Sequence, residues 1–285
     1  MSFKKLPTAF PWYSRLERQN RFRENVRNLA EYGLLSPRDG LLPFQFMHPG
    51  QGVVQNWVIF NRATGALVAT MDSGSLSQVR TVVRESRRYF YYGGGLLNTT
   101  GGGGLALSEG LYYSRIGFSD GTNVFSEVFR VPACSWGVGG VSDFLKLEWW
   151  NDTDLRPIFY QDLSLGLPYF RNIVYLDTFV HTSEPEVLEE GEKDGDDKIV
   201  PTFQKAIVKY RVTDLVPDFL KVALVVMQMH DHVILTTPGG METGEIDSII
   251  TNTQSEQGGG FSTVDIIYQE EIAMIKKGCG DNMAP

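Results

Sequence analysis

Two histidines at the end of an apolar stretch come nearest to the residue types and spacing of a metal site. His230 and His232 flank Asp231, and imidazole and carboxylate groups are ligands that Zn²⁺ accepts. In a strand or a turn, the two rings can reach one ion. No third clear ligand group lies beside them in sequence, and the helix dipole alone favours a histidine at a helix end. We therefore expect no metal here.

Other stretches with the composition of a chemical site lack the necessary spacing. The segment YYGGGLLNTTGGGG (91–104) is rich in glycine, but a phosphate-binding loop continues with Lys and Ser or Thr, whereas Leu105 and Ala106 follow here. His48 and His181 have no recognisable nucleophile partner, and the hydrolase, metalloprotease and redox motifs are absent from the sequence. We expect a protein that is not an enzyme and has no catalytic residue or cofactor.

An acidic run separates two strand-like segments in the second half of the chain. Residues 184–198 contain eight Asp or Glu and two Lys, with two glycines among them. The run does not keep the ligand spacing of a calcium-binding loop. It is also too polar to bury the apolar surface that would offset its ordering entropy. We interpret residues 184–200 as a long acidic hairpin loop between a strand over 170–181 and a strand that begins near Phe203.

One strongly apolar helix follows this hairpin. The segment PDFLKVALVVMQMHD (217–231) overlaps a predicted helix over 214–229, which begins near Asp214 or Pro217 and has apolar residues on nearly every side. Such a helix is too short to span a bilayer, which needs roughly 20 residues. We expect it to pack on a sheet on one side and on a neighbouring subunit on the other.

Short apolar runs separated by glycine and proline dominate the first half. The sequence contains 30 Gly and 13 Pro, which favours strands joined by turns. Residues 53–70 predict a β-hairpin that turns at Ala63-Thr64-Gly65. Residues 114–132 predict another, which turns at Asp120-Gly121. Strands at this spacing are typical of a small immunoglobulin-like sandwich.

The N-terminal segment has a different pattern. Residues 10–32 place Trp12, Leu16 and further apolar residues at roughly helical spacings, and they predict a helix. Arginines on the remaining surface alternate with glutamates, which argues against direct nucleic-acid binding. We expect an arm that docks on a partner or on its own domain.

A second domain is expected to begin after the glycine-rich segment 133–140. If LKLEWW (145–150) is a strand, Trp149 and Trp150 point to opposite faces of it. Exposure of one tryptophan at a contact and burial in the seam between the domains both fit the sequence.

Together these patterns predict a mainly β fold with two β-sandwich-like domains. We expect an N-terminal arm (1–45), an immunoglobulin-like sandwich (46–133), a second sandwich with the helix and the acidic hairpin (134–277) and a mobile tail (278–285). The net charge is −8, but residues 1–130 carry +6 and residues 131–285 carry −14. This difference would orient copies of the chain on one another in a salt-dependent way. We expect no signal peptide, membrane segment or disulfide framework.

Seven segments with recognisable motifs cover most of the chain. They are PWYSRLERQNRFRENV (11–26), SPRDGLLPFQF (36–46), DGTNVFSEVFRVP (120–132), LEWWNDTDL (147–155), FYQD (159–162), PTFQKAIVKYRV (201–212) and ALVVMQMHDHVILTT (223–237). Together they resemble structural proteins of tailed phages that infect Bacteroidetes. The resemblance implies a virion protein of the tail, baseplate or neck that is made in the host cytoplasm. Phage tail-tube and distal-tail proteins have a β-sandwich with a flanking helix and a long hairpin that completes a ring, and the second half of this chain is similar to that plan.

We therefore expect a structural subunit that assembles with itself into a ring and contacts other virion proteins, without a membrane. The hairpin and the helix are expected to supply the contacts, through Phe179, Val180, Glu189, Glu190, Phe203, Tyr210, Phe219, Leu220 and Leu224. The alternative is a module that binds a glycan or another host-surface ligand. In that alternative, exposed Tyr91 and Tyr92 and the glycine-rich loop recognise the ligand.

Overall fold

Strands dominate the computed structural model of this chain. It describes residues 6, 8–14, 34–48, 50–84, 87–133, 144–155, 157–162, 167–168, 170–178, 180–182, 186–193, 199–237, 248–255 and 261–276. Two helices occur within these residues, and the prediction of a mainly β fold is confirmed. The expected tail 278–285 and most of the expected junction 133–140 lie outside the described residues.

The largest sheet has seven strands and comes from the first half of the chain. Its strands are β1 (Trp12–Ser14), β2 (Leu34–Leu35), β4 (Val54–Asn61), β5 (Leu67–Thr70), β8 (Gly110–Phe118), β9 (Asn123–Ser126) and β10 (Phe129–Val131). The order β1-β9-β8-β10-β2 forms the main path, while β4 pairs with β8 and β5 pairs with β4. The pairing of β2 with β10 is parallel, and the other pairings of this sheet are antiparallel.

A three-stranded sheet packs against this one through aromatic side chains. It has the order β3 (Phe44–His48), β7 (Arg87–Tyr92), β6 (Arg80–Arg84). The ring of Phe90 lies 4.9 Å from that of Phe118, and the ring of Tyr92 lies 5.2 Å from that of Trp57. Edge-to-face contacts of this kind add to the free energy of burying the rings. The short helix α3 (Ser73–Ser77) follows β5, and the Asp72 carboxylate caps it by accepting a hydrogen bond from the Ser75 N–H.

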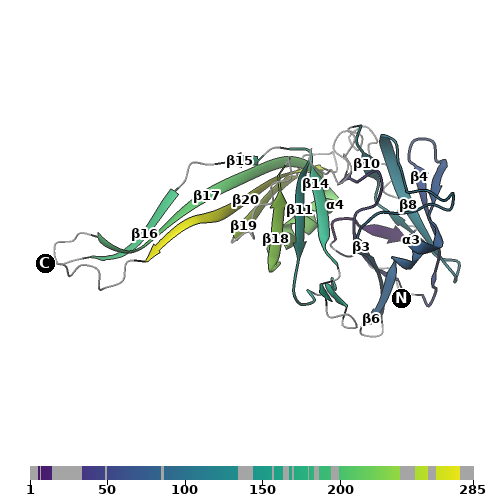
Figure 1. Cartoon of the computed structure of the whole chain (residues 1–285), viewed down its shortest axis with the longest axis horizontal. Helices are drawn as coiled ribbons and strands as arrows, with labels where there is room; N and C mark the ends of the chain where they lie inside the picture. The colour runs from purple at the N-terminus through teal and green to yellow at the C-terminus, as the bar shows by residue number, and fades with distance from the viewer. Residues whose placement is uncertain are drawn as a thin grey trace.

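The second half of the chain adds three sheets and a helix. One sheet has the order β14 (Asn172–Leu176), β11 (Leu145–Trp150), β18 (His232–Thr236), and β12 (Gln161–Asp162) pairs with β13 (Leu167–Pro168). The five-stranded sheet contains β15 (Val180–Thr182), β16 (Glu186–Lys193), β17 (Ile199–Pro217), β19 (Ser248–Ser255) and β20 (Phe261–Lys276). Helix α4 (Asp218–Met227) contacts β17, β19 and β20. Figure 1 shows the distal ends of β16, β17 and β20 extending far from the other sheets.

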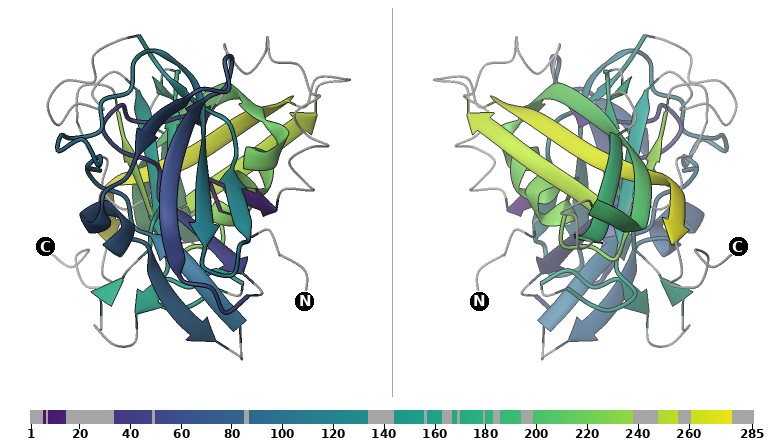
Figure 2. Two further views of the ribbon diagram at one scale, coloured as in Figure 1. Left: turned by 90° about the vertical axis from the view of Figure 1, so that its right-hand side faces the viewer. Right: turned by 90° about the vertical axis from the view of Figure 1, so that its left-hand side faces the viewer.

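One cluster of buried apolar side chains connects both halves of the chain. It includes Phe10 and Trp57 from the first half and Trp149, Leu224 and Ile266 from the second. Strand β2 contributes Leu34 and Leu35 and contacts β14. Seen from the left-hand side of Figure 1, β17 and β20 cross in front of the strands of the first half (Figure 2, right). The two halves therefore share buried surface.

The predicted N-terminal helix is wrong where the structure describes the segment. Residues Trp12–Ser14 form β1, which pairs with β9, and residues 15–33 lie outside the described part. The ring of Trp12 lies 4.5 Å from that of Phe44, and the ring of Phe10 lies 5.8 Å from that of Phe129. Because these rings are buried in the shared core, tertiary packing outweighs the helical spacing of the apolar residues. This part of the expected arm belongs to the fold itself.

The acidic segment is more ordered than the sequence indicated. Residues Glu186–Lys193 form β16, and the returning strand β17 begins at Ile199, so the expectation of a loop is wrong for most of 184–200. The ladder tolerates Pro201, whose partner is Gly191, because a register shift lies beside that pair. Proline lacks the N–H that a regular ladder uses, and irregular positions accommodate it. Pairing along β17 supplies the stabilisation that the segment cannot supply alone.

Helix α4 is shorter than the predicted helix over 214–229, and it begins directly after Pro217, one of the two expected starting points. Residues 214–217 continue β17, where Asp214 pairs with Val264 and Pro217 with Phe261. Pro217 then occupies the N-cap position of α4, and the helix ends at Met227. The fixed φ of proline suits this transition from strand to helix.

The predicted turns and the tryptophan alternation agree with the structure. Strands β4 and β5 pair around Gly65, and β8 and β9 pair around Gly121, each glycine having a positive φ. Trp149 is buried, whereas Trp150 is half-buried on the opposite face of β11.

Candidate assembly surface

The most extended feature of the molecule is the distal part of the five-stranded sheet, which we call the arm: β16 with the segments of β17 and β20 paired alongside. Strand β17 has 19 residues, which corresponds to about 60 Å at about 3.3 Å per residue. It pairs with β16 from Glu186↔Ile207 to Lys193↔Ile199 and with β20 along most of its length. The arm therefore presents three strands away from the core (Figure 1).

Both edges of the arm lack a strand neighbour among the described residues. The pairing of β19 with β20 stops at Ser248↔Gln269, so within the described part of the chain residues 270–276 pair only with β17. Strand β16 likewise pairs on one side only. Its sequence, EVLEEGEK, carries four glutamates, whereas residues 272–275 of β20 read IAMI. Charge discourages pairing at an edge, and an apolar edge favours it. The two edges of the arm therefore differ in their capacity to accept a strand.

The base of the arm is fixed to the core on one face and is polar on the other. Val212 and Val216 of β17 and Val264 and Ile266 of β20 are buried in the shared core. On the exposed face, Arg211 donates a 2.7 Å hydrogen bond to Asp265. The hydrogen bonds from Arg211 and Thr213 lower the pKa of Asp265 below its usual value. This alternation fits a strand with one covered and one wet face.

Helix α4 has an inner and an outer apolar face. Its inner face contributes Leu220, Ala223, Leu224 and Met227 to the core. On its outer side, Val222 is 53% exposed and Val225 is 39% exposed, and Met229 just beyond the helix is 64% exposed. We call Val222, Val225 and Met229 the α4 ridge.

The residues expected to make assembly contacts fall into three groups. Leu220 and Leu224 are buried and belong to the core. Tyr210 and Phe219 are half-buried and pack against that core. The remaining residues are distributed as follows: Val180 in β15, Glu189 and Glu190 in β16, Phe203 in β17, and Phe179 outside the described residues.

Sequence reasoning missed the exposed apolar residues that the structure reveals. The α4 ridge and Val187 of β16, which is 61% exposed, were not among the expected contact residues. The signal for the ridge was present, because a helix with apolar residues all round has more than one face to cover. Which of those faces meets the core depends on the ladders of β17 and β20, which no local pattern specifies.

The two histidines considered as metal ligands have separate partners. His232 Nε2 lies 2.9 Å from an Asp152 carboxylate oxygen, and its ring stacks on Trp150. His230 faces the interior, where Nδ1 donates to the Val226 carbonyl at 2.9 Å and Nε2 contacts the Tyr160 hydroxyl. In the described part of the chain, no cluster of three or more His, Cys, Asp or Glu residues suits a metal ion.

Tyr160 and His230 belong to a buried chain of hydrogen bonds. The Asn172 side-chain amide donates to the Tyr160 oxygen at 3.1 Å and accepts from the Ala9 N–H at 3.1 Å. Because His230 Nδ1 carries the proton given to Val226, Nε2 accepts from Tyr160. Burial raises the pKa of Tyr160 and lowers the pKa of His230, so both groups stay neutral. These hydrogen bonds tie the N-terminal segment to β14 and to the end of α4. Asn172, Tyr160 and His230 therefore have a structural role.

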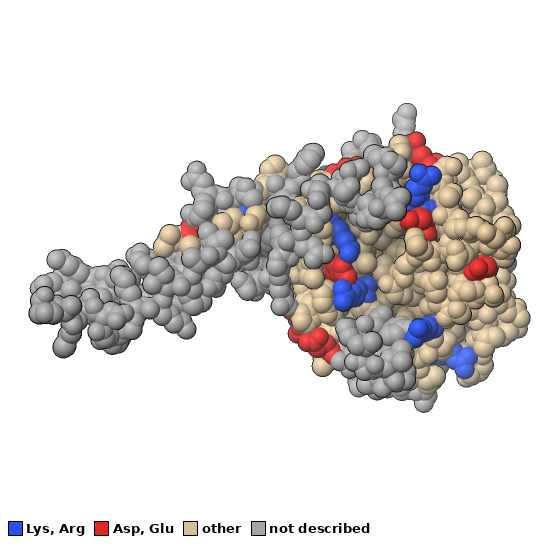
Figure 3. All heavy atoms as spheres, in the orientation of Figure 1, with Lys and Arg blue, Asp and Glu red and all other residues tan. Residues whose placement is uncertain are grey.

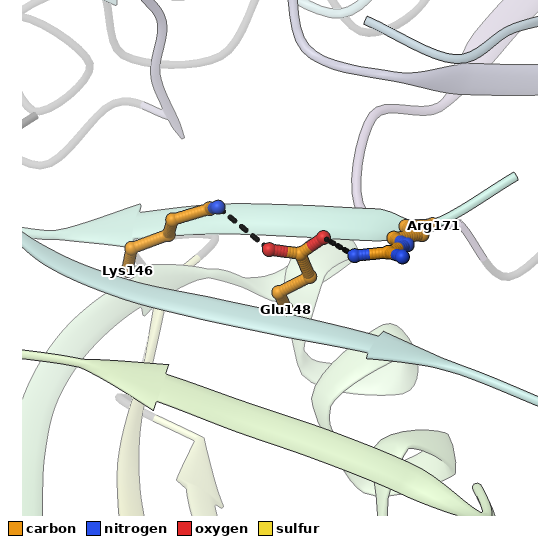
Figure 4. Close-up of polar contacts among 3 residues, drawn as sticks. All are labelled: Lys146, Glu148 and Arg171. Carbon is orange, nitrogen blue, oxygen red and sulfur yellow. Dashed lines mark hydrogen bonds and ion pairs between the residues drawn. The ribbon is translucent and has the colours of Figure 1, made fainter. Parts of the chain in front are cut away.

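A charged triad occupies the face of β11 opposite Trp149 (Figure 4). Glu148 accepts hydrogen bonds from Lys146 Nζ at 2.6 Å and from Arg171 at 2.9 Å. Burial raises the pKa of Glu148, but these two cations outweigh it, so the pKa lies below its usual value. Arg171 also lies 4.2 Å over the Trp150 ring. On the face drawn in Figure 3, charged residues of both signs lie close together in the middle of the molecule.

A second buried histidine joins two loops of the first half. His48 Nδ1 accepts the Gly50 N–H at 3.0 Å, so Nε2 carries the proton and donates to Thr122 Oγ1 at 2.7 Å. Thr122 Oγ1 in turn donates to Asp120. The order His–Thr–Asp looks like a proton relay, but the imidazole donates to the hydroxyl and cannot act as its base in this arrangement. The three residues fasten the β8–β9 turn to β3.

This arrangement predicts a loss of stability in mild acid. Burial lowers the pKa of His48 below 6.5, although Asp120 opposes the shift and Arg88 reinforces it. Since the unfolded chain binds the proton more readily, the stability from neutral His48 is complete above about pH 6.5 and declines below it, by at most about 1.4 kcal/mol per pH unit. Gln can make the same two bonds without titrating, so His48→Gln should reduce the fall in unfolding free energy between pH 7 and pH 5. Urea titrations at both pH values test this, and an equal fall in both proteins would contradict it.

Comparisons with known proteins do not assign the chain to a family. None of the described helices is long and apolar enough to cross a membrane. No family model matches the chain, and no curated protein matches it.

Proposed function

We propose that this chain is a non-enzymatic structural subunit of a tailed-phage virion, in the tail, baseplate or neck. The resemblance of its motifs to phage structural proteins supports the virion location, with synthesis in the host cytoplasm. The proposal of self-assembly rests on the arm, because its two strand edges have no neighbour within the described residues. A neighbouring copy supplies the missing strand, and repetition by cyclic symmetry closes a ring.

The proposal also assigns roles to the sheets. The two facing sheets of the first half form an immunoglobulin-like sandwich, and the sheets around α4 form the tail-tube-like sandwich that carries the arm. The apolar edge of β20 at residues 272–275 pairs with the next subunit, while the glutamates of β16 keep the other edge open for a different virion protein. The α4 ridge adds apolar contact area beside the base of the arm.

A shortened arm tests this function. Because Glu186 pairs with Ile207 and Ile207 pairs with Glu271, replacing residues 187–206 by Asn-Gly and ending the chain after Glu271 stops all three strands at one level. Asn-Gly favours the tight turn that such a hairpin needs. We expect the wild type to form a closed oligomer and the shortened variant to be a folded monomer. Light scattering measures the mass, and circular dichroism checks the fold.

A matched control removes apolar surface elsewhere. Leu67 and Val68 of β5 are 57% and 46% exposed, so Leu67→Thr with Val68→Thr should leave the oligomer intact. An oligomer that survives arm shortening would refute the role of the arm. A wild-type monomer at every concentration and salt would refute self-assembly.

The alternative of a glycan-binding module loses the feature on which it depended. Tyr91 and Tyr92 were expected to be exposed, but they are 4% and 0% exposed. The Tyr92 hydroxyl donates to the Gly95 carbonyl at 2.7 Å, which holds the start of the glycine-rich loop. Tyr92 belongs to the shared core, and Tyr91 is buried on the opposite face of β7, so both rings are closed to a sugar.

A further inference from the structure

A cavity lies where the two halves of the chain meet. Its volume is about 340 Å³, within the lower range of small-ligand sites. Strands β2, β10, β14 and β17 and the first turn of α4 all contribute to its walls. Seven of the eleven lining residues are aliphatic, and Leu34, Leu35, Leu176 and Leu220 are among them. Polar and apolar groups share the accessible surface of the cavity about equally, with the polar share slightly larger.

One carboxylate in this wall is partly withdrawn from water. Asp214 of β17 lines the cavity, and its Oδ1 accepts a hydrogen bond from the neighbouring Leu215 N–H at 2.7 Å. Burial is the main cause that raises the pKa of Asp214 to about 6; the nearby Asp177 adds to the rise, while the Leu215 N–H and Arg130 oppose it. At neutral pH the cavity therefore contains a desolvated anion that a suitable cation would stabilise.

The other charged groups of the lining do not supply that cation directly. Arg130 donates to Asp177 Oδ2 at 3.3 Å, at the more exposed side of the cavity, where the Asp177 side chain is 66% exposed. Tyr175, the remaining titratable group of the lining, has a pKa raised by burial and is neutral. With Asp214 ionised, Arg130, Asp177 and Asp214 sum to one negative charge.

We propose that this cavity binds an aliphatic chain that ends in a primary ammonium group. The aliphatic part packs against the leucines, and the ammonium group pairs with Asp214. An anionic ligand would meet the Asp214 carboxylate, and a neutral apolar ligand would leave that carboxylate desolvated. A lysine side chain of another polypeptide and a free alkylamine share the required chemistry. The inference concerns this cavity alone and does not depend on the proposed ring.

Binding of n-butylamine, which reproduces the lysine side chain, tests the proposal. At pH 7.5 we expect n-butylamine to shift the NMR signals of methyl groups lining the cavity, while 1-butanol of the same length binds at least about tenfold more weakly because it lacks the charge. Asp214→Asn should weaken binding of the amine about tenfold or more, and so should a pH near 5, where Asp214 is protonated. Asp152→Asn, the same change at an exposed site on the β18 side, should leave binding unchanged.

A capped lysine, N-acetyl-lysine methylamide, distinguishes a lysine side chain of another polypeptide from a free alkylamine as the ligand. Binding as tight as that of n-butylamine identifies a polypeptide side chain as the ligand, whereas binding of the amine alone identifies a free alkylamine. Absence of binding for both compounds, or equal binding to wild type and Asp214→Asn, overturns the proposal. Urea unfolding of each variant establishes that a loss of binding does not come from a loss of fold.

Discussion

Replacing Leu224 by alanine is expected to lower the free energy of unfolding by about 2–5 kcal/mol, the range for a leucine truncated in a packed core. Leu224 is fully buried on the inner face of α4 and belongs to the cluster that reaches into the first half. Truncation removes dispersion contacts and leaves a cavity that β17 and β20, held by a long ladder, cannot fill by moving. Urea titration of the wild type and the variant measures the difference.

The adjacent residue provides the matched control. Val225 points outward and is 39% exposed, so Val225→Ala should change the unfolding free energy by less than about 1 kcal/mol. If both substitutions destabilise equally, the orientation of α4 described above is wrong.

When assembly is measured instead of stability, the substitution at Val225 should have a larger effect than the substitution at Leu224. Val225→Asp places a charge on the α4 ridge, where the proposed ring buries apolar surface, and should raise the dissociation constant of the oligomer about tenfold or more. Leu224→Ala should reduce assembly only in proportion to the fraction unfolded. Light scattering over a dilution series gives the dissociation constant of the oligomer for each variant. An unchanged dissociation constant for Val225→Asp would remove the ridge from the interface.

Local chemistry explains which parts of the fold were predictable. The turns at Gly65 and Gly121 require a positive φ that glycine adopts readily, and that requirement is visible in the sequence. The alternation of Trp149 and Trp150 follows from the two-residue repeat of a strand. Helix α4 was recognisable from its continuous apolar character, and Pro217, one of the two expected starting points, lies at its N-cap.

Long-range pairing explains what was missed. The acidic strand β16 has poor strand-forming composition and is ordered by β17, a neighbour that no window of sequence around Glu189 identifies as its partner. Trp12 joins β1 because Phe44 and Phe46 come from another part of the chain to cover it. The cavity at Asp214 combines residues from β2, β10, β14, β17 and α4, so its ligand chemistry depends on the tertiary structure.

The same cavity leads to a stabilising substitution. Asp214→Asn is expected to raise the free energy of unfolding by about 1–3 kcal/mol at pH 7.5. The pKa of Asp214 is about 6 in the folded protein, against 3.8 for an unperturbed Asp, because burial penalises its ionised form. Asn removes the buried charge and retains an oxygen that can accept the Leu215 N–H.

The pH dependence of this gain gives the prediction its sharpest test. A raised folded pKa means that the folded state holds its proton longer, so the stability due to protonated Asp214 is complete below about pH 3.8 and is lost as pH rises through about 6. The advantage of Asp214→Asn should therefore be small near pH 4 and complete above pH 7. Urea titrations of both proteins at pH 4.5 and 7.5 measure it, and Asp152→Asn, at an exposed carboxylate, should show less than about 1 kcal/mol at either pH. A gain of equal size at both pH values would show that the Asp214 charge is not its cause, and it would also remove the electrostatic basis for an ammonium ligand in the cavity.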